Sequence, residues 1–396
     1  MSGSEIGIDA LQALDGFQIE IPSWGFANTG TRFGKFLQPA AATSLEEKFA
    51  DAAQVHALTG VTPQLALHVL WDVPEGIADA AKVRQLADRY GIRPGSINPN
   101  LFQDQQYKFG SICNPDAAIR KLAIDHLLES VRIAKELKSS DISIWIADGS
   151  NYPGSQSVRR RILWLEEALA ATHAALGDAQ RMLIEYKPFE PAFYHTDIAD
   201  WGMASRLAQT AGPQARVLVD TGHHYLSQNI EQIVAWLLHM RRLGGFHFND
   251  RRYADDDLTI GSIDPYQVFR IFHEIFNEPD AAQVREIAFM IDQSHNLKGK
   301  IEAMVQTVMT AQELYLKAAL VDRERLRELQ AAGKVVEAEE CLRSAFWTDV
   351  RPALSEWRMK RGLHPNPLDA LAESGYVERI TRERRERNAA LATSYA

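Results

Sequence analysis

Four apolar stretches of the sequence each end in a side chain that can bind a metal ion. The stretches are short and rich in Val, Ile, Leu and Phe, as is typical of strands that are buried on both faces. The side chains that end them are Glu185, Asp220, His247 and Asp292. A buried carboxylate without compensation costs several kcal/mol. The repetition at four consecutive strand ends therefore predicts a divalent cation among these groups.

A second group of possible ligands lies close to the first in the sequence. His223 follows Asp220 by three residues, and an acidic run further along contains Asp255 and Asp257. These two aspartates can point the same way in an extended loop. With Asp220 shared between two ions, they and His223 would complete the ligand set of a second ion, and two such ions can clamp oxygen atoms of a substrate. The spacing alone leaves a solvated acidic loop as the alternative.

Parallel strands are the elements that would bring these side chains together. Short apolar runs alternate with helical patterns between Gly16 and Asp292. The expected strands are 17–21, 65–70, 95–98, 141–146, 182–187, 216–220, 245–249 and 286–292. Eight strands alternating with helices predict a (β/α)8 TIM barrel, whose active site lies at the C-terminal strand ends. An open doubly wound sheet is the alternative, but Pro22-Ser23-Trp24-Gly25 stands where such a sheet usually has a glycine-rich phosphate turn.

Helices are expected between the strands and after the last of them. We expect 44–58 to be helical, with Thr43-Ser44 as its cap, and 116–138, with Asn114 as its cap. Further helices are expected at 76–90, 157–176, 197–210, 228–242, 264–276, 299–345 and 368–393. These α/β elements predict a catalytic barrel over residues 1–298. A helical C-terminal extension over 299–396 would then pack on the barrel or on another subunit.

Composition and charge argue against several classes of protein. The 396 residues carry a formal net charge of −9, so the chain lacks the basic surface of a nucleic-acid-binding protein. The two cysteines, Cys113 and Cys341, are far apart, which favours a reducing compartment without a disulfide framework. No apolar run reaches the ~18 residues of a membrane span, and the N-terminal residues do not resemble a signal peptide. We expect a cytoplasmic protein without nucleic-acid or membrane partners.

The ordered motifs at the strand ends resemble those of the L-rhamnose isomerases and, more broadly, of the xylose isomerase-like barrels. They are Glu-Tyr-Lys at 185–187, Asp-x-x-His at 220–223, His-Phe-Asn at 247–249, Asp-Asp-Asp at 255–257 and Asp-x-x-His-Asn at 292–296. The resemblance covers about residues 15–300, and the helical tail also fits the family. Xylose isomerases proper carry an acid in place of His247 and a glutamate in place of Asp220. These departures favour the L-rhamnose isomerase branch.

The resemblance implies two divalent metal ions per subunit. The four strand-end ligands would hold a structural ion that chelates the substrate. Asp220 would bridge to a catalytic ion held by His223, Asp255 and Asp257. Mn²⁺ is the expected metal, with Co²⁺, Mg²⁺ and Zn²⁺ as alternatives. A homo-oligomer, most often a tetramer in this family, is implied as well.

The resemblance also implies roles for side chains beside the metals. Lys187 would donate to the oxygen on the carbonyl carbon of the sugar, and a water held by Asp292 would be the base of an enediolate route. His68, with Asp72 as an orienting acid, would open the sugar ring. The expected substrate contacts are Trp24, His68, Phe102, Trp145, Lys187, His223 and, in a neighbouring subunit's site, Phe33.

The expected activity is aldose–ketose isomerisation in sugar catabolism, from L-rhamnose to L-rhamnulose with breadth towards related aldoses. Hydrogen would move between carbons one and two by a hydride shift or through a cis-enediolate. A one-metal ketose 3-epimerase would end its eighth strand in Glu, so Asp292 and the Asp255/Asp257 pair point away from it. A multi-zinc nuclease is disfavoured by the scarcity of Lys and Arg near the strand ends. A non-catalytic sugar-binding barrel would not need the second ion.

Overall fold

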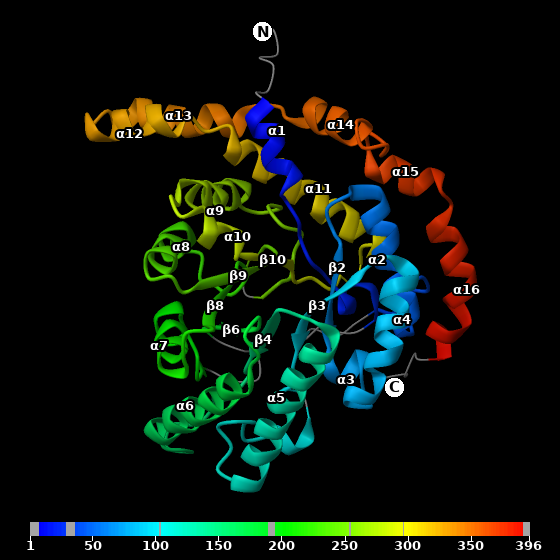
Figure 1. Ribbon diagram of the computed structural model, residues 1–396, viewed down its shortest axis with the longest axis vertical. Coiled ribbons are helices and arrows are strands. Elements are labelled where there is room, and N and C mark those ends of the chain that lie inside the picture. The colour runs from blue at the N-terminus through cyan, green and yellow to red at the C-terminus, as the bar shows by residue number, and fades with distance from the viewer. Residues whose placement is uncertain are drawn as a thin grey trace.

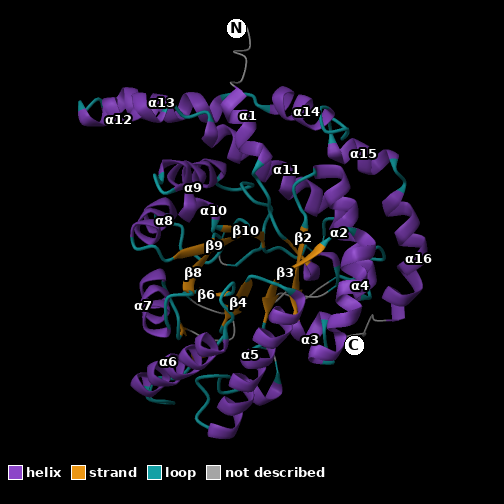
Figure 2. Ribbon diagram, viewed as in Figure 1, coloured by secondary structure: helices purple, strands orange, loops and turns teal. Residues whose placement is uncertain are grey.

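Eight parallel strands form the centre of the molecule, in the order β1-β2-β3-β4-β6-β8-β9-β10 (Figures 1 and 2). The computed structural model describes residues 8–28, 36–102, 104–188, 195–252, 255–295 and 297–390. The strands are β1 (Ile21–Pro22), β2 (Gln64–His68), β3 (Arg93–Asn98), β4 (Asp141–Trp145), β6 (Arg181–Glu185), β8 (Ala215–Asp220), β9 (Leu243–Phe248) and β10 (Ala288–Ile291). Glu20 pairs with Met290 and closes the sheet. The predicted barrel is confirmed.

Helices surround the strands on the outside (Figure 1). The longer ones over the barrel region are α1 (Ile8–Asp15), α2 (Leu45–Thr59), α4 (Ala80–Tyr90), α5 (Ala117–Leu137), α6 (Val158–Ala175), α7 (Trp201–Ala211), α8 (Ile230–His239) and α9 (Pro265–Asn277). The shorter ones are η1 (Ser23–Phe26), α3 (Val69–Asp72), η2 (Gly76–Asp79), η3 (Gln105–Tyr107) and α10 (Ala281–Arg285). None of the described helices has an apolar stretch long enough to cross a membrane.

The two faces of each strand have different surroundings because side chains alternate along a strand. Outward-facing residues such as Val217 and Val219 join the large core beneath the helices. Inward-facing residues of β6, β8 and β10 form a small separate cluster of Leu183, Leu218 and Met290. The residues two positions further along these strands are Glu185, Asp220 and Asp292. The strand period therefore places the predicted ligands at the C-terminal mouth of the barrel interior.

Several element boundaries differ from the sequence-based expectation. β1 is shorter than 17–21, although the chain before it is paired, since the Ile19 N–H donates to the Val61 carbonyl at 2.9 Å. β2 ends at His68 because residues 69–72 turn into the short helix α3. Asp116, and not Asn114, caps α5: its side chain accepts the Ala118 N–H at 2.8 Å. The sequence-based prediction also missed α1 and the small antiparallel sheet of β5 (Gly149–Ser150) and β7 (His195–Thr196).

The C-terminal region is helical throughout its described part. It comprises α11 (Lys300–Ala319), α12 (Arg323–Ala331), α13 (Val335–Trp347), α14 (Arg351–Met359), α15 (Pro367–Glu373) and α16 (Tyr376–Ala390). α11 packs on α1, α2 and α9 of the barrel. Figure 1 shows α12 and α13 extending away from the strands, whereas α14, α15 and α16 follow the outer surface beside α2 and α4.

Candidate metal centre and substrate cleft

Four side chains at the C-terminal ends of β6, β8, β9 and β10 point to a common centre. They are Glu185, Asp220, His247 and Asp292, and one ligand atom of each lies within 4.8 Å of the others. Nδ1 of His247 is 3.4 Å from Glu185 Oε2, 3.8 Å from Asp292 Oδ2 and 4.0 Å from Asp220 Oδ2. Ligand atoms about 2.1 Å from one ion lie about 3.0 to 4.2 Å apart. The spacing therefore fits a single divalent ion.

The electrostatics of this cluster also favour a cation. Burial raises the pKa of Asp220 well above its usual range, and the charges of Glu185 and Asp292 raise it further. Burial alone would lower the pKa of His247, but Glu185 and the neighbouring acids raise it to about 10. Three carboxylates around one imidazole thus hold more negative charge than this buried setting tolerates. A divalent ion would compensate that charge.

Neighbouring groups fix the carboxylates of Asp220 and Asp292. The Gly222 N–H donates to Asp220 Oδ1 at 2.7 Å, and Nδ2 of Asn249 lies 3.1 and 3.2 Å from the two Asp220 oxygens. A Cβ atom at Gly222 would come within 2.3 Å of Asn249 Oδ1, so this contact requires glycine. Nε1 of Trp24 donates to Asp292 Oδ1 at 2.8 Å, which leaves Asp292 Oδ2 facing His247. Such supporting contacts orient metal ligands.

The structure brings part of the expected second ligand set together beside the first. Nε2 of His223 is 3.2 Å from Asp255 Oδ1 and 3.7 Å from Asp220 Oδ2. Nδ1 of His223 lies 3.1 Å from the Tyr186 carbonyl oxygen, a contact that would direct Nε2 towards the two acids. Asp257 lines the same cavity, and its charge contributes to the raised pKa of Asp220. Binding of a second ion by this group is still a prediction.

Lys187 lies beside the second group rather than in the cavity wall. Its Nζ atom is 2.7 Å from Asp255 Oδ2, and both side chains are buried. The same nitrogen is 5.4 Å from the centre of the Trp145 ring. The described cavity lining does not include Lys187. The expected contact between Lys187 and a sugar oxygen is therefore still a prediction.

The surroundings of His68 differ from the expectation. Nδ1 of His68 is 3.1 Å from the Asn98 carbonyl oxygen, a contact that requires the tautomer with a proton on Nδ1. Asp72 does not orient the imidazole; it accepts the backbone N–H of His68, the Ser23 hydroxyl and the Lys48 ammonium at 2.6 to 2.8 Å. Burial lowers the pKa of His68 to about 4. The ring is therefore neutral at pH 7. The backbone carbonyl of Asn98 orients the imidazole, and not the carboxylate of Asp72 as expected.

A cleft of about 820 Å³ opens over the cluster. One wall is a row of rings, with centroid distances of 4.6 Å for Trp24 and His68, 5.7 Å for His68 and Phe102, and 4.8 Å for Phe102 and Trp145. His223 lines the cleft as well. Of the expected substrate contacts, Trp24, His68, Phe102, Trp145 and His223 thus line this cleft. Phe33, which was expected to reach a neighbouring subunit, lies outside the described residues.

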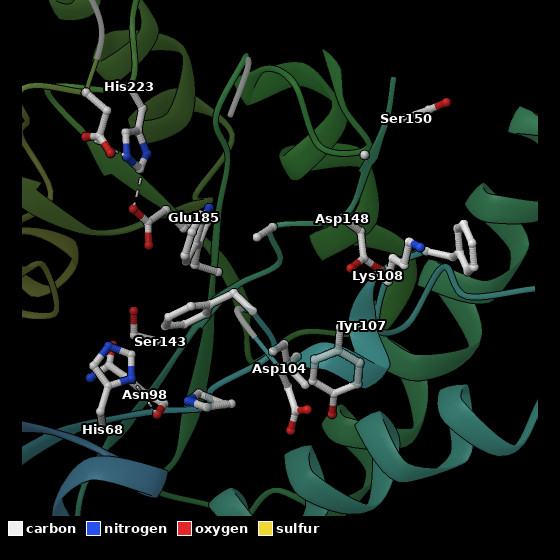
Figure 3. A pocket seen from close by; sticks show the side chains of 18 of the residues that line it. His68, Asn98, Asp104, Tyr107, Lys108, Ser143, Asp148, Ser150, Glu185 and His223 are labelled. Carbon is white, nitrogen blue, oxygen red and sulfur yellow. Dashed lines mark hydrogen bonds and ion pairs between the residues drawn. The ribbon is translucent and has the colours of Figure 1, made fainter. Parts of the chain in front are cut away.

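The sequence reading missed several lining residues. The Trp71 ring contacts the His68 ring at a tilt, with a centroid distance of 4.3 Å, and Asn98 and Ser143 lie at the inner end of the cleft (Figure 3). The strand-end argument, applied to β3, could have identified Asn98. The cleft also extends over the loops 104–109 and 148–156, which carry no recognisable motif.

Comparisons with known proteins agree with this geometry. Residues 51–292 match the family described as xylose isomerase-like TIM barrel. A Rhizobium meliloti protein named "Probable sugar isomerase" is 40% identical over 386 residues, which cover 96% of this chain and 89% of the relative. An L-rhamnose isomerase from Bacteroides thetaiotaomicron is 23% identical over 84% of this chain and 81% of its own. The solved structure of an L-ribulose 3-epimerase shares the fold, with a TM-score of 0.55 and 13% identity over 77% of this chain and 98% of that chain.

Proposed function

Because the chain belongs to the xylose isomerase-like TIM barrel family, we propose that it is a metal-dependent sugar isomerase that interconverts an aldose and a ketose. The observation that carries this proposal is the pairing of two ligand groups at one barrel mouth. Nε2 of His223 lies 3.2 Å from Asp255 Oδ1 and 3.7 Å from Oδ2 of Asp220, which belongs to the four-ligand cluster. The specific reaction we propose is L-rhamnose to L-rhamnulose, with breadth towards related aldoses and with Mn²⁺ as the metal. The 23% identity to an L-rhamnose isomerase and the motifs at the strand ends support this choice.

The residues of the cleft can perform the proton movements of such a reaction. His68 is neutral at pH 7, so its Nε2 can accept the proton of an anomeric hydroxyl group while the sugar ring opens. The rings of Trp24, Phe102 and Trp145 offer apolar faces to the C–H groups of the sugar and exclude water. The ammonium of Lys187 lies next to Asp255, where it would stabilise negative charge that develops on a substrate oxygen.

The candidate ligands form two groups, and each group would hold one divalent ion. Glu185, Asp220, His247 and Asp292 would hold one divalent ion, and Asp220, His223, Asp255 and Asp257 the other. Bound ions would supply Lewis-acid polarisation of the sugar oxygens. Trp24 and Asn249 keep the carboxylates of Asp292 and Asp220 in place for that purpose. Transfer of hydrogen from carbon two to carbon one, with the hydroxyl proton of carbon two passing to the oxygen on carbon one, would then convert the aldose to the ketose.

A ketose 3-epimerase is the second candidate. Among the described residues at the barrel mouth, only the four-ligand cluster has ligand atoms that all lie within 4.8 Å of one another. This cluster would hold one ion, and one ion is sufficient for a ketose 3-epimerase. Such an epimerase would use a glutamate at the end of β10. The chain has Asp292 there, and Trp24 already occupies one of its oxygens. The shorter, restrained carboxylate favours the isomerase.

Product analysis separates the two candidates. Metal-stripped protein is incubated with L-rhamnose, with and without Mn²⁺, and the products are identified by chromatography. We expect L-rhamnulose only with the metal, and none from Asp255→Ala. Asp256→Ala is the matched control in the same acidic run, because Asp256 accepts the Arg252 N–H and does not line the cleft. No rhamnulose, together with exchange between D-fructose and D-allulose, would identify an epimerase.

We also propose that the protein is a homotetramer in which the barrel over 1–298 is the catalytic domain and 299–396 serves packing between subunits. The side chains of Val335, Val336 and Trp347 on the projecting α13 support this, because each is more than 70% exposed. Val335 and Val336 are adjacent at the start of α13, and adjacent exposed apolar side chains can form part of a protein interface. Multi-angle light scattering of the full chain would give four times the monomer mass, and a monomer would contradict the proposal.

A further inference from the structure

The cleft is larger than the proposed reaction of a free monosaccharide requires. Cavities of about 300–1,000 Å³ enclose drug-sized ligands, and this cleft of about 820 Å³ lies in the upper part of that range. An open-chain hexose or deoxyhexose is smaller than such a ligand. Figure 3 shows Glu185, His223 and His68 at one side and Asp104, Tyr107 and Lys108 at the other. We call the second side the outer half; its residues are 104–109 and 148–156.

Buried polar contacts hold the two loops of the outer half together. The Asp148 carboxylate accepts the N–H groups of Ser111 at 2.6 Å and Cys113 at 2.7 Å. The guanidinium of Arg161 donates to the Gly149 carbonyl at 3.0 Å and to Asp197 at 2.7 Å. Asp148 and Arg161 are each only 2% exposed. The outer half is thus built on a rigid base, as a binding site requires.

A second group of possible metal ligands lies at the base of the outer half, but its polar atoms are already used by the contacts just described. Ligand atoms of Cys113, Asp148 and Asp197 lie within 4.8 Å of one another. Both oxygens of Asp148 already accept backbone N–H groups, and Asp197 is paired with Arg161. Burial raises the pKa of the Cys113 thiol well above its usual value, so the thiol is protonated and a poor ligand. The group serves to anchor the loops.

The chemistry of the outer half suits a neutral, hydroxylated ligand. The aromatic rings of Tyr107, Phe109 and Tyr152 line it together with polar groups that can donate and accept hydrogen bonds, such as Ser155 and Gln156. Such a mixture recognises the apolar faces and the hydroxyl groups of a sugar ring. The charged lining residues of this half are one amine, Lys108, and two acids, Asp104 and Asp148. A phosphate group would be repelled by the acids.

We propose that the substrate carries a neutral glycosyl group at the end remote from the reacting carbons, and that this group occupies the outer half of the cleft. The inference rests on the proposed function, which places carbons one and two at the metal ligands. The rest of the carbon chain then passes the Phe102 and Trp145 rings towards Tyr107. The substrate class is a reducing disaccharide or a larger glycosylated aldose. No bond of the glycosyl group changes in the reaction.

Binding of unreactive sugar alcohols tests this inference separately from turnover. The probes are L-rhamnitol and its 4-O- and 5-O-β-D-glucosyl derivatives, titrated calorimetrically into Mn²⁺-loaded protein. We expect at least one glucosyl derivative to bind tenfold or more tightly than L-rhamnitol. Ser155→Trp, which fills the outer half, should remove that advantage. Ser140→Trp, an exposed serine next to the N-terminal end of β4, is the matched control and should preserve it.

The outcomes are distinguishable from a failure of the proposed function. Equal or weaker binding of all glucosyl derivatives, or an advantage that survives Ser155→Trp, would overturn the outer subsite even if L-rhamnose is isomerised. A protein that prefers the glucosyl probes but does not turn over L-rhamnose would keep the subsite and contradict the proposed monosaccharide reaction.

Discussion

At the scale of single residues, the hydrogen bond from Trp24 to Asp292 Oδ1 decides which carboxylate oxygen of Asp292 faces His247. Trp24→Phe removes the donor and keeps an aromatic ring. Losing a supporting contact of a ligand typically lowers metal affinity about 10- to 100-fold, and we expect that loss for Mn²⁺ by isothermal titration calorimetry. Trp71→Phe is the matched control, because the Trp71 ring also contacts the His68 ring but has no described contact with Asp292. An equal loss in both variants would contradict the role of Trp24.

The gathering of the four candidate ligands at the barrel mouth was predictable from the sequence, whereas the contacts of their neighbours were not. Glu185 and Asp220 end apolar strands, and the two-residue period of a strand fixes the side to which they point. The sequence indicated that Trp24 lines the cleft, but it did not indicate the hydrogen bond from Trp24 to Asp292. The two residues are 268 positions apart and meet only because the barrel closes. The partner of His68 is a backbone carbonyl on another strand, and side-chain types carry no information about such a contact.

At the scale of elements, the interior of the barrel holds an acid that affects stability. Glu20, just before β1, reaches across to β3, where the Ser96 N–H donates to it at 2.9 Å. A Cβ at Gly95 would lie 2.1 Å from Glu20 Oε2, so the glycine makes room for this side chain. Burial raises the pKa of Glu20 from its usual value of 4.5 to about 7, although Ser96 opposes the shift.

This shift predicts a stability gain for Glu20→Gln at high pH. The folded state holds the Glu20 proton more tightly than the unfolded state, so stability falls as pH rises from 4.5 to 7. Over this pH range the free energy of unfolding falls by about 3 kcal/mol in total. Glu20→Gln removes this penalty and should be more stable than the parent protein by up to that amount at pH 8, with little difference at pH 4.5. Urea unfolding at both pH values measures it, with the exposed Glu386→Gln as control. A variant destabilised at pH 8 would contradict the account.

Element positions were predicted better than element ends. The apolar runs that become β4, β6, β8 and β9 are bounded by polar residues and turns, so the pattern located them. The pattern extended β2 through Leu70, because Val69 and Leu70 continue the apolar run although the chain turns into α3 after His68. The small antiparallel sheet of β5 and β7 has two-residue strands, which are too short for a periodic pattern.

At the scale of the whole molecule, buried charges attach α16 to the barrel. Arg384 lies 2.8 Å and 3.0 Å from the two oxygens of Asp51 on α2, and the Tyr376 hydroxyl donates to Asp51 at 2.7 Å. Arg384→Met would leave the buried Asp51 without its cation, which costs about 3–5 kcal/mol. We expect a loss of that size in the free energy of unfolding, with faster hydrogen exchange in α16. Arg382→Met, exposed on the same helix, should change neither. Equal behaviour of the two variants would show that the contact is dispensable.

The sequence predicted helices over 299–345 and 368–393, but neither α14 (Arg351–Met359) nor the way in which these helices attach to the barrel. Charges of both signs run through 379–387, as is typical of a solvated helix, yet Arg384 is only 3% exposed. Its partner Asp51 lies 333 positions earlier, on a helix of the barrel. Local patterns identify a helix, but only the folded molecule shows which of its charges become buried.

We propose that two ions bound at one barrel mouth make this chain an aldose–ketose isomerase. The most direct test is a titration of metal-stripped protein with Mn²⁺ in which bound ions per chain and L-rhamnulose formation are measured on the same samples. We predict that formation rises mainly between one and two ions per chain. In Asp255→Ala, binding should stop near one ion and no product should form. Full activity with one ion, or product without metal, would contradict the account.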